Sequence, residues 1–415
     1  MNHLFGRTSD IRVGQKWRCS SLIVLIFSGL GFPILQFGGS LLLWMVILFL
    51  MNINSILRLP ARLLYWTIFL IFSYVCIFLL KGAEPPYFVT VAIISALFVL
   101  SNYLEADNKF FSDLSLILKW FMYYSLISIP IMIVGGGVMT EVVLGYSAYK
   151  TFGYLFWFSP VGGPALFNEL RMIGLTWEPG IWQMFLNINF MFALYERRAN
   201  YQLVLALIAT LTCFSTTGIF VSMVVFMWYL LVVSQRITVK QILIPILIAL
   251  ALSPLLVINI NEKISGKHMG SGATRIADLF TGLVVLSDHP FLGADVELAK
   301  ASNNPDIVAI KTFFWRGNFT DGAYEGYLTV SNSNGYIIFL LDWGLPVGIF
   351  LLLSLFRNKL FPYDHRLNSA VMIIILISMS AEAISRTGFF YFFILAALFV
   401  RPKRQSLADA QQVTL

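Results

Sequence analysis

The segment RMIGLTWEPGIW, residues 171–182, has an arginine at its start and a glutamate within its Trp-Glu-Pro-Gly turn. Arg171 and Glu178 lie just before a long apolar run, and Pro179 suits the first position of a helix. A guanidinium stays charged and can grip two phosphate oxygens at once, whereas a partly buried carboxylate can accept a proton near neutral pH. The turn therefore predicts either a phosphate-binding arginine beside a general base, or a capped helix whose arginine extends toward lipid phosphates.

Two further segments combine arginines with groups that suit sugars. TRIADLFTGLVVLSDHPFLGAD contains Arg275 and, one helix-length later, His289. FFWRGNFTDGAYEGY surrounds Arg316 with aromatic residues that include Trp315. Sugars stack on aromatic rings through their C–H faces, so these residues are candidate substrate-binding groups. Taken singly, each ring also fits the aromatic belt of a membrane interface, and a lone loop histidine is more often structural.

Four polar residues follow in the last fifth of the chain. Asn334 is a candidate for orienting an acceptor hydroxyl, or it caps the helix that follows it. Asp342 is a candidate substrate-binding residue that acts as the partner of an arginine, or a helix-packing residue. Glu382 and Arg386 are one helical turn apart, so they are expected to pair with each other if their helix continues that far.

The composition restricts the class of protein. Of the 415 residues, 58% are hydrophobic, 28 are basic and 21 are acidic, and the mean hydropathy is +0.80. Such a chain cannot be solvated as one soluble globule, whereas lipid accepts an apolar surface. The composition predicts an all-α polytopic integral membrane protein that forms a single membrane domain over residues 1–415. The three cysteines lie in or beside apolar runs and predict no disulfide framework.

Apolar runs long enough to cross about 30 Å of hydrocarbon predict about twelve transmembrane helices. If both the N- and C-termini are cytoplasmic, 18 of the 28 basic residues fall on the cytoplasmic side, which is the positive-inside pattern. The net charge of +7 then reflects membrane orientation, and no nucleic-acid partner is expected. The predicted spans are 20–36, 40–54, 63–80, 87–103, 120–139, 180–195, 201–214, 217–234, 241–260, 335–355, 367–385 and 388–400.

Two outer segments, 140–179 and 261–334, are much longer than ordinary connections. Functional residues concentrate on such loops, and most of the candidates above fall within them or at their ends. Within the second loop, apolar residues recur at helical spacing between residues 276 and 284. This spacing predicts an amphipathic helix that lies at the outer membrane interface.

The order of four motifs resembles the O-antigen polymerase and ligase superfamily of integral membrane glycosyltransferases. The motifs are RMIGLTWEPG, FSTTGIF, TRIADLFTGLVVLSDHPFLGAD and NSNGYIIFLLDWGLPVG, and the similarity covers roughly residues 165–356. The resemblance implies transfer of a glycan from undecaprenyl diphosphate to an acceptor, in the bacterial inner membrane and at its periplasmic face. The two long outer segments would then be periplasmic loops.

The resemblance also implies which residues act. Arginines of the periplasmic loops are expected to engage the donor diphosphate, and Arg171 and Arg275 occupy such positions, with Arg316 a weaker candidate. Glu178 is the candidate base. No Asp-X-Asp sequence occurs in the chain, so we expect neither a metal nor another cofactor. The expected partners are the lipid-linked oligosaccharide, membrane lipid and, in the same pathway, a chain-length regulator and a flippase.

Two departures from the ligase pattern favour a polymerase of the Wzy type over a ligase of the WaaL type. Ligases carry a His-Asn pair where this chain has Ser333-Asn334, and Ser-Arg where it has Ser215-Thr216. A serine hydroxyl cannot replace imidazole as a base at neutral pH. A ligase that transfers glycan to the lipid A core remains the alternative enzyme, and a transporter or flippase for lipid-linked glycans is the alternative of another class.

Overall fold

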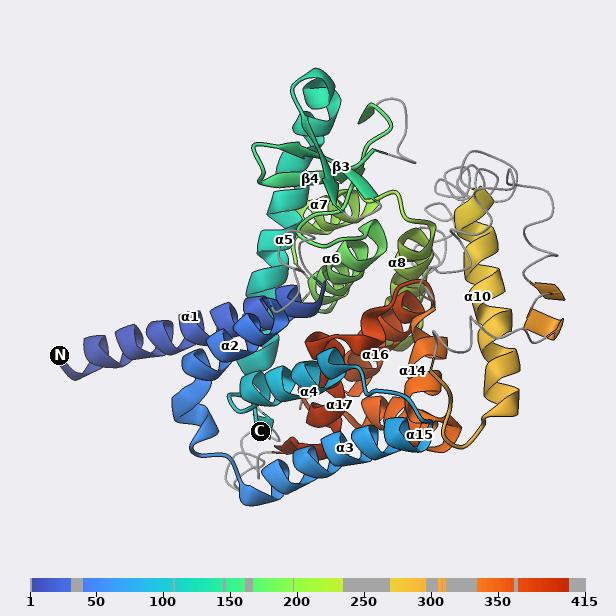
Figure 1. Ribbon diagram of the computed structural model, residues 1–415. Coiled ribbons are helices and arrows are strands. Elements are labelled where there is room, and N and C mark those ends of the chain that lie inside the picture. Colours follow the sequence, from blue (N-terminus) through green and yellow to red (C-terminus); the bar gives the residue numbers. More distant parts are fainter. Residues whose placement is uncertain are drawn as a thin grey trace.

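The structure is a computed structural model, and it is mostly helical, in agreement with the predicted helical class. A small sheet accompanies the helices (Figure 1). The residues that it describes are 2–30, 40–106, 109–144, 147–160, 167–196, 198–233, 269–295, 305–307, 309–310, 334–361 and 365–402.

Most of the predicted apolar runs form helices. The first five described helices are α1 (Asn2–Leu30), α2 (Ser40–Ile56), α3 (Ala61–Leu80), α4 (Tyr87–Leu100) and α5 (Lys109–Val134). The middle of the chain adds α6 (Pro179–Tyr195), α7 (Asn200–Leu211), α8 (Thr216–Trp228) and α10 (Met269–Asp288). The last are α14 (Gly335–Trp343), α15 (Leu345–Ser354), α16 (His365–Met379) and α17 (Gly388–Phe399). The predicted span 241–260 lies outside the described residues.

Two of the described helices, α3 and α5, are long and apolar enough to cross a bilayer. Seven shorter apolar stretches of 10–17 residues accompany them. Helix α3 has many large apolar side chains on the surface of the protein: Tyr65, Trp66, Phe69 and Phe72 are each more than 45% exposed. A helix with this outward face suits a lipid environment. The number of twelve spans stays a prediction.

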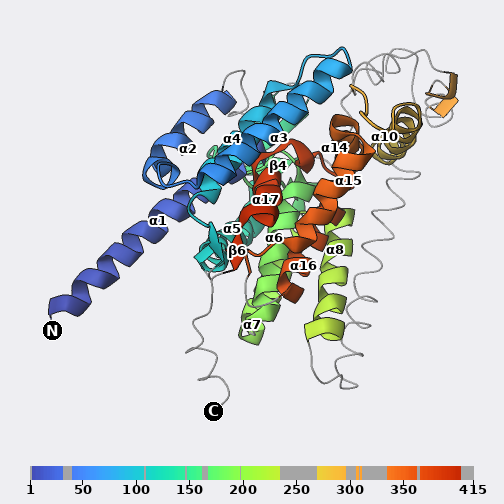
Figure 2. The same ribbon diagram turned by 90° about the horizontal axis from the view of Figure 1, so that it is seen from below.

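Helix α6 forms the centre of the fold. Every residue from Pro179 to Leu194 is buried, and the helix is surrounded by α5, α7, α8 and α16 (Figures 1 and 2). Trp182 anchors its first turn, since the indole stacks on Phe121 with ring centroids 4.5 Å apart and donates a hydrogen bond of 3.0 Å to Ser125 Oγ. The turn that precedes α6 is therefore held on a rigid central element.

Two predicted spans are interrupted. The expected span 335–355 divides into α14 and α15 at Gly344, whose φ of 73° is accessible mainly to glycine. The expected helix 367–385 ends at Met379, and a 3₁₀ turn (Ile384–Arg386) leads into α17. The prediction of continuous helices was wrong at both places, and the second break separates Glu382 from Arg386.

Residues 140–172 contain a four-stranded antiparallel sheet that the all-α prediction did not include. Its strands, in spatial order, are β2 (Thr140–Leu144), β3 (Ser147–Phe152), β4 (Phe156–Ser159) and β5 (Arg171–Met172). Tyr149, Trp157 and Ile173 form a small apolar core of their own against this sheet. The sheet lies beside the C-terminal half of α5 (Figure 1), where the Tyr124 ring stacks on Phe156 of β4, and it carries Arg171 on its last strand.

Candidate functional site

The RMIGLTWEPG segment forms a compact turn that runs from β5 into α6. Gly174 has a φ of 63°, and a Cβ placed on it would lie 2.0 Å from the Trp182 ring, so only glycine fits this position. Thr176 Oγ1 bridges the turn by donating to the carbonyl oxygens of Ile173 (2.7 Å) and Glu178 (3.0 Å). These contacts fix the backbone between Arg171 and Glu178.

Arg171 and Glu178 are both partly buried at the ends of this turn. Arg171 pairs with Ser159 of β4, and the next residue, Met172, donates its N–H to the carbonyl oxygen of Thr212 at 3.2 Å. The guanidinium lies within electrostatic range of Cys213, after the end of α7. Glu178 is the N-cap residue of α6 with extended backbone, but its side chain makes no capping hydrogen bond. The carboxylate is therefore not used up as a helix cap.

A second carboxylate meets the same helix end. A Cβ on Gly180, in the first turn of α6, would lie 2.2 Å from Glu382 Oε1, so the absence of a side chain there lets the Glu382 carboxylate approach the helix. Glu382 is 5% exposed and lies between α16 and α17. The positive end of a helix dipole stabilises a buried negative charge. Sequence spacing paired Glu382 with Arg386; the structure places it against α6.

The start of α14 packs against the 380–387 turn that contains Glu382. Asn334 caps this helix, since its Oδ1 accepts hydrogen bonds from the backbone N–H groups of Tyr336 (3.1 Å) and Ile337 (3.2 Å). A Cβ on Gly335 would lie 2.6 Å from the Glu382 carbonyl oxygen. The first turns of α6 and α14 therefore converge on the residues around Glu382, and two glycines make the approach possible.

Asp342 forms a buried ion pair with Arg386. The guanidinium donates two hydrogen bonds to the carboxylate, Nη2 to Oδ1 at 2.6 Å and Nε to Oδ2 at 2.8 Å. Asp342 is 1% exposed, and the Arg386 side chain is 25% exposed. Of its two expected roles, Asp342 has that of an arginine's partner. Arg386 also lies over the Phe88 ring, 5.3 Å from its centroid, and lines a pocket of about 260 Å³ between α1, α4 and α17.

Lys81 adds a second cation to this cluster. Its Nζ donates to the carbonyl oxygens of Leu341 (2.7 Å) and Asp342 (2.8 Å), near the end of α14. Burial lowers the pKa of Lys81 to about 8, against the opposing effect of the Asp342 carboxylate. The cluster of Lys81, Asp342 and Arg386 joins the connection between α3 and α4 to α14 and to the start of α17.

The segment that contains Arg275 and His289 docks on α14. Helix α10 packs on α14 through Val285, Leu286, Ile337 and Leu341, and Figure 1 shows it at the edge of the molecule. The exposed His289 follows this helix in a turn that closes when the Gly293 N–H donates to its carbonyl oxygen at 2.9 Å. Two of the four motifs are thus in direct contact.

Three further candidates, Arg275, Trp315 and Arg316, have side chains outside the described part of the chain. Arg275 lies in the first half of α10, at a position whose side chain is outside the description. Trp315 and Arg316 lie outside the described residues, as do Ser333 and the sugar-binding loop proposed around them. The described part of the chain thus brings the starts of α6 and α14, with Glu178 and Asn334 as their N-cap residues, to Glu382, and places Arg171 on β5 at the other end of the turn before α6.

Sequence reasoning missed the position of Glu382 and the true partner of Arg386. The available signal was the glycine in the first turn of two helices, at Gly180 and Gly335, because such residues permit close approach of another segment. It also missed Gln183, which is fully buried beside Gly218 and has no hydrogen bond at either side-chain polar atom within the described residues. Comparison of the chain with protein-family models, with characterised proteins and with solved structures finds no match.

Proposed function

We propose that the chain is a twelve-span protein of the bacterial inner membrane that polymerises lipid-linked oligosaccharide units at the periplasmic face. The membrane part of the proposal is supported by the composition and by the exposed apolar faces of α2 and α3. Leu42, Leu43 and Leu50 of α2 are each more than 45% exposed, as are four of the six aromatic residues of α3, Tyr65, Trp66, Phe69 and Phe72. A soluble protein rarely exposes apolar side chains on this scale.

The contacts between distant segments support the proposed sidedness. Segments assigned to the cytoplasmic side join one another: Arg18 pairs with Asp113, and β1 (Glu105–Ala106) pairs with β6 (Arg401–Pro402). Segments assigned to the periplasmic side do the same, through Lys81 and the Asp342–Arg386 pair. None of these four described contacts joins a segment assigned to the cytoplasmic side with one assigned to the periplasmic side. They therefore agree with the order of crossings deduced from charge.

The observation that carries the enzymatic proposal is the convergence of two helix starts, one of which directly follows the turn that contains Arg171 and Glu178. The first turns of α6 and α14 meet at Glu382, and both belong to the motifs that carry the resemblance. Helix N-termini and an arginine provide positive electrostatic potential where a departing diphosphate accumulates negative charge. Glu178, a partly buried carboxylate at the start of α6, is the proposed proton acceptor.

In the proposed reaction, a hydroxyl oxygen of an incoming lipid-linked unit attacks the anomeric carbon of the growing glycan. The new glycosidic C–O bond forms as the bond to the diphosphate breaks, and undecaprenyl diphosphate leaves with the bonding electron pair. Glu178 takes the hydroxyl proton, and Arg171 holds the diphosphate, with Arg275 and Arg316 as further candidates from the second loop. Asn334, His289 and Trp315 remain the proposed contacts to sugar, and Asp342 holds Arg386.

Purified protein in proteoliposomes tests this proposal. The only substrate is one synthetic undecaprenyl-diphosphate-linked repeat unit, with no nucleotide sugar and no other enzyme, and a gel reports the products. A ladder of products that grow by one repeat unit supports a polymerase. Transfer that occurs only when lipid A core is added makes the protein a ligase, and folded protein that transfers to neither acceptor excludes both.

A further inference from the structure

A second pocket lies between α1, α2, the end of α4 and the start of α5, in the part of the chain assigned to the cytoplasmic side. Its volume is about 830 Å³, and its described lining includes three cations, Arg18, Arg58 and Lys109, and no acidic residue. None of the residues proposed for glycan transfer lines it. The positive charge of the lining therefore favours an anionic ligand. This conclusion does not depend on whether the protein is a polymerase.

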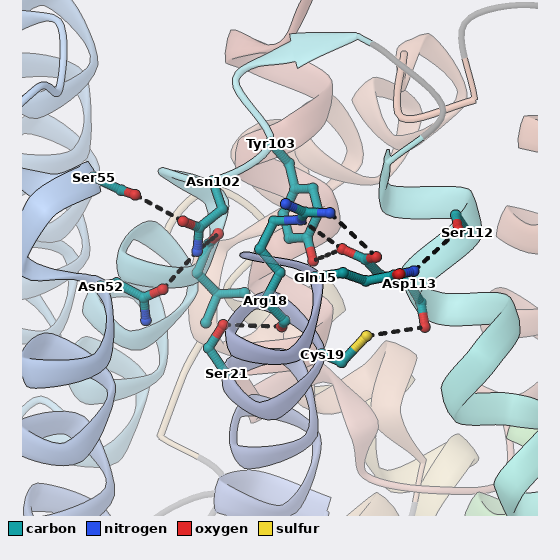
Figure 3. A network of polar contacts seen from close by, with 11 residues as sticks. Gln15, Arg18, Cys19, Ser21, Asn52, Ser55, Asn102, Tyr103, Ser112 and Asp113 are labelled. Atoms are coloured by element: carbon teal, nitrogen blue, oxygen red, sulfur yellow. Dashed lines mark hydrogen bonds and ion pairs between the residues drawn. The ribbon is translucent and has the colours of Figure 1, made fainter. Parts of the chain in front are cut away.

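Amide and hydroxyl groups form a fixed polar wall of this pocket (Figure 3). Asn102 Nδ2 donates to Asn52 Oδ1 at 2.5 Å, and Ser55 Oγ donates to Asn102 Oδ1 at 2.7 Å. Asn52 Nδ2 donates to the carbonyl oxygen of Leu48 within α2, so its side chain cannot turn away. This wall joins α2 to the end of α4 and is built before any ligand arrives.

Arg18 is held at the pocket by a fully buried carboxylate. Its Nε donates to Asp113 Oδ2 at 2.7 Å, and Tyr103 donates its hydroxyl to the same oxygen at 3.0 Å (Figure 3). The ion pair balances the charge of Arg18 and orients its guanidinium, whose Nη1 lies beside Gly14 at the pocket wall. Among the described residues, the hydrogen bonds of Arg18 come from Nε and Nη2, so the N–H groups of Nη1 are available to a ligand.

Arg58 and Lys109 add two further cations to the lining of this pocket. Both are exposed, and Lys109 begins α5, where the helix dipole adds to its positive potential. Two exposed apolar side chains, Trp17 (59%) and Leu50 (62%), also line the pocket and are called its apolar rim. The pocket thus combines fixed polar groups, cations and exposed apolar side chains, which matches a molecule with a charged head and a hydrocarbon tail.

We infer that this pocket binds a phosphate group, and that the apolar rim selects the phosphate of an anionic lipid headgroup. Guanidinium and ammonium groups suit phosphate oxygens, and the hydrogen-bonded amide wall keeps this side of the pocket polar. A free phosphate ion shares this chemistry but makes no use of the rim.

The test measures lipid retention by the full chain in detergent, with phosphatidic acid as the probe and native mass spectrometry as the readout. The double variant Arg58→Gln/Lys109→Gln removes the two exposed cations of the pocket. We expect its affinity for phosphatidic acid to fall about tenfold, since each surface cation near a lipid phosphate contributes a few-fold. The matched control Lys16→Gln/Arg62→Gln removes the same charge from exposed positions outside the lining and is expected to change the affinity by less than about twofold.

Inorganic phosphate distinguishes the two sources of the anion. If phosphate ions bind the unmodified chain and displace the lipid, the pocket accepts the free anion as well; if only the lipid binds, the rim is required. Asn54→Asp, which adds a negative charge at an exposed lining position, should weaken lipid binding in the same way if the double variant fails to fold. Equal losses in the pocket and control variants, or no loss in either pocket variant, would overturn the inference.

Discussion

Gly180 is the residue that allows Glu382 to reach the first turn of α6. Its position in the Glu-Pro-Gly sequence has two uses: Pro179 starts the helix, and the missing side chain leaves room for a carboxylate. A buried acid in this place brings negative charge to the helix end at which Glu178 is the N-cap residue. The close approach of Glu382 therefore explains why the motif contains a glycine directly after its proline.

Gly180→Ala is expected to destabilise the protein. The new Cβ would lie 2.2 Å from Glu382 Oε1, so the buried carboxylate must move, at a cost of about 1–3 kcal/mol. Unfolding by titration with sodium dodecyl sulfate measures the change. Gly137→Ala is the control, because nothing lies within 4 Å of its added Cβ. Equal stability of the two variants would show that Glu382 does not occupy this place.

The Asp342–Arg386 pair yields a second prediction. Asp342→Asn leaves Arg386 without its buried counter-charge, so we expect a loss of about 3–5 kcal/mol in the free energy of unfolding. The double variant Asp342→Asn/Arg386→Gln should lose less than the sum of the two single variants. The more exposed pair Lys119–Glu196 is the control, where Lys119→Gln should cost about 0–1 kcal/mol. Additive effects at Asp342 and Arg386 would argue against the pair.

Lys81 should make stability depend on alkaline pH. Its pKa is about 8 in the folded chain and about 10.5 when exposed, so the unfolded chain binds more protons between these values. Folded Lys81 bears the cost of its buried charge below pH 8, and stability from this group rises as pH increases from about 8 to about 10.5. Lys81→Met should remove this rise in the thermal unfolding midpoint, whereas Lys359→Met, at an exposed position, should keep it. An unchanged pH profile in Lys81→Met would contradict the assignment.

At the scale of elements, hydrophobic runs predicted the helices well and their interruptions poorly. The run 180–195 became α6 because a mostly apolar stretch of this length favours a buried helix, even with Gln183, Asn187 and Asn189 within it. The run 335–355 also looked continuous, but Gly344 adopts a left-handed φ and the backbone of Phe291 fills the space beside it. A tertiary contact caused that break, and a single sequence contains no local record of such a contact.

The short strands were missed for a related reason. β5 has two residues and β4 has four, which is too short for an alternating pattern to be recognised. The residues Arg171, Glu178 and Asn334 could be chosen from their chemistry and their place at helix starts. The convergence of the α6 and α14 starts on Glu382 depends on how these helices and the 380–387 turn pack together, so sequence spacing could not supply it.

At the scale of the whole molecule, contacts of the proposed cytoplasmic and periplasmic segments form separate sets, which makes sidedness testable. In a variant that lacks the three native cysteines, Tyr154→Cys in the exposed β3–β4 turn should react with a membrane-impermeant maleimide added to intact spheroplasts. Lys359→Cys, exposed between α15 and α16, should react only after the membrane is opened. Reaction of both positions in intact spheroplasts would contradict the proposed crossings.

The most direct test of the account is the rate of polymerisation by Arg171 variants in the proteoliposome assay. We predict that Arg171→Ala slows ladder growth about 100-fold or more, because a cation that stabilises the leaving diphosphate is lost. Arg171→Lys should recover part of the rate, and Lys150→Ala, on β3 of the same sheet, should leave it unchanged. Each variant is first matched to the unmodified chain in its unfolding midpoint. A full-rate ladder from folded Arg171→Ala would contradict the placement of the reaction at this turn.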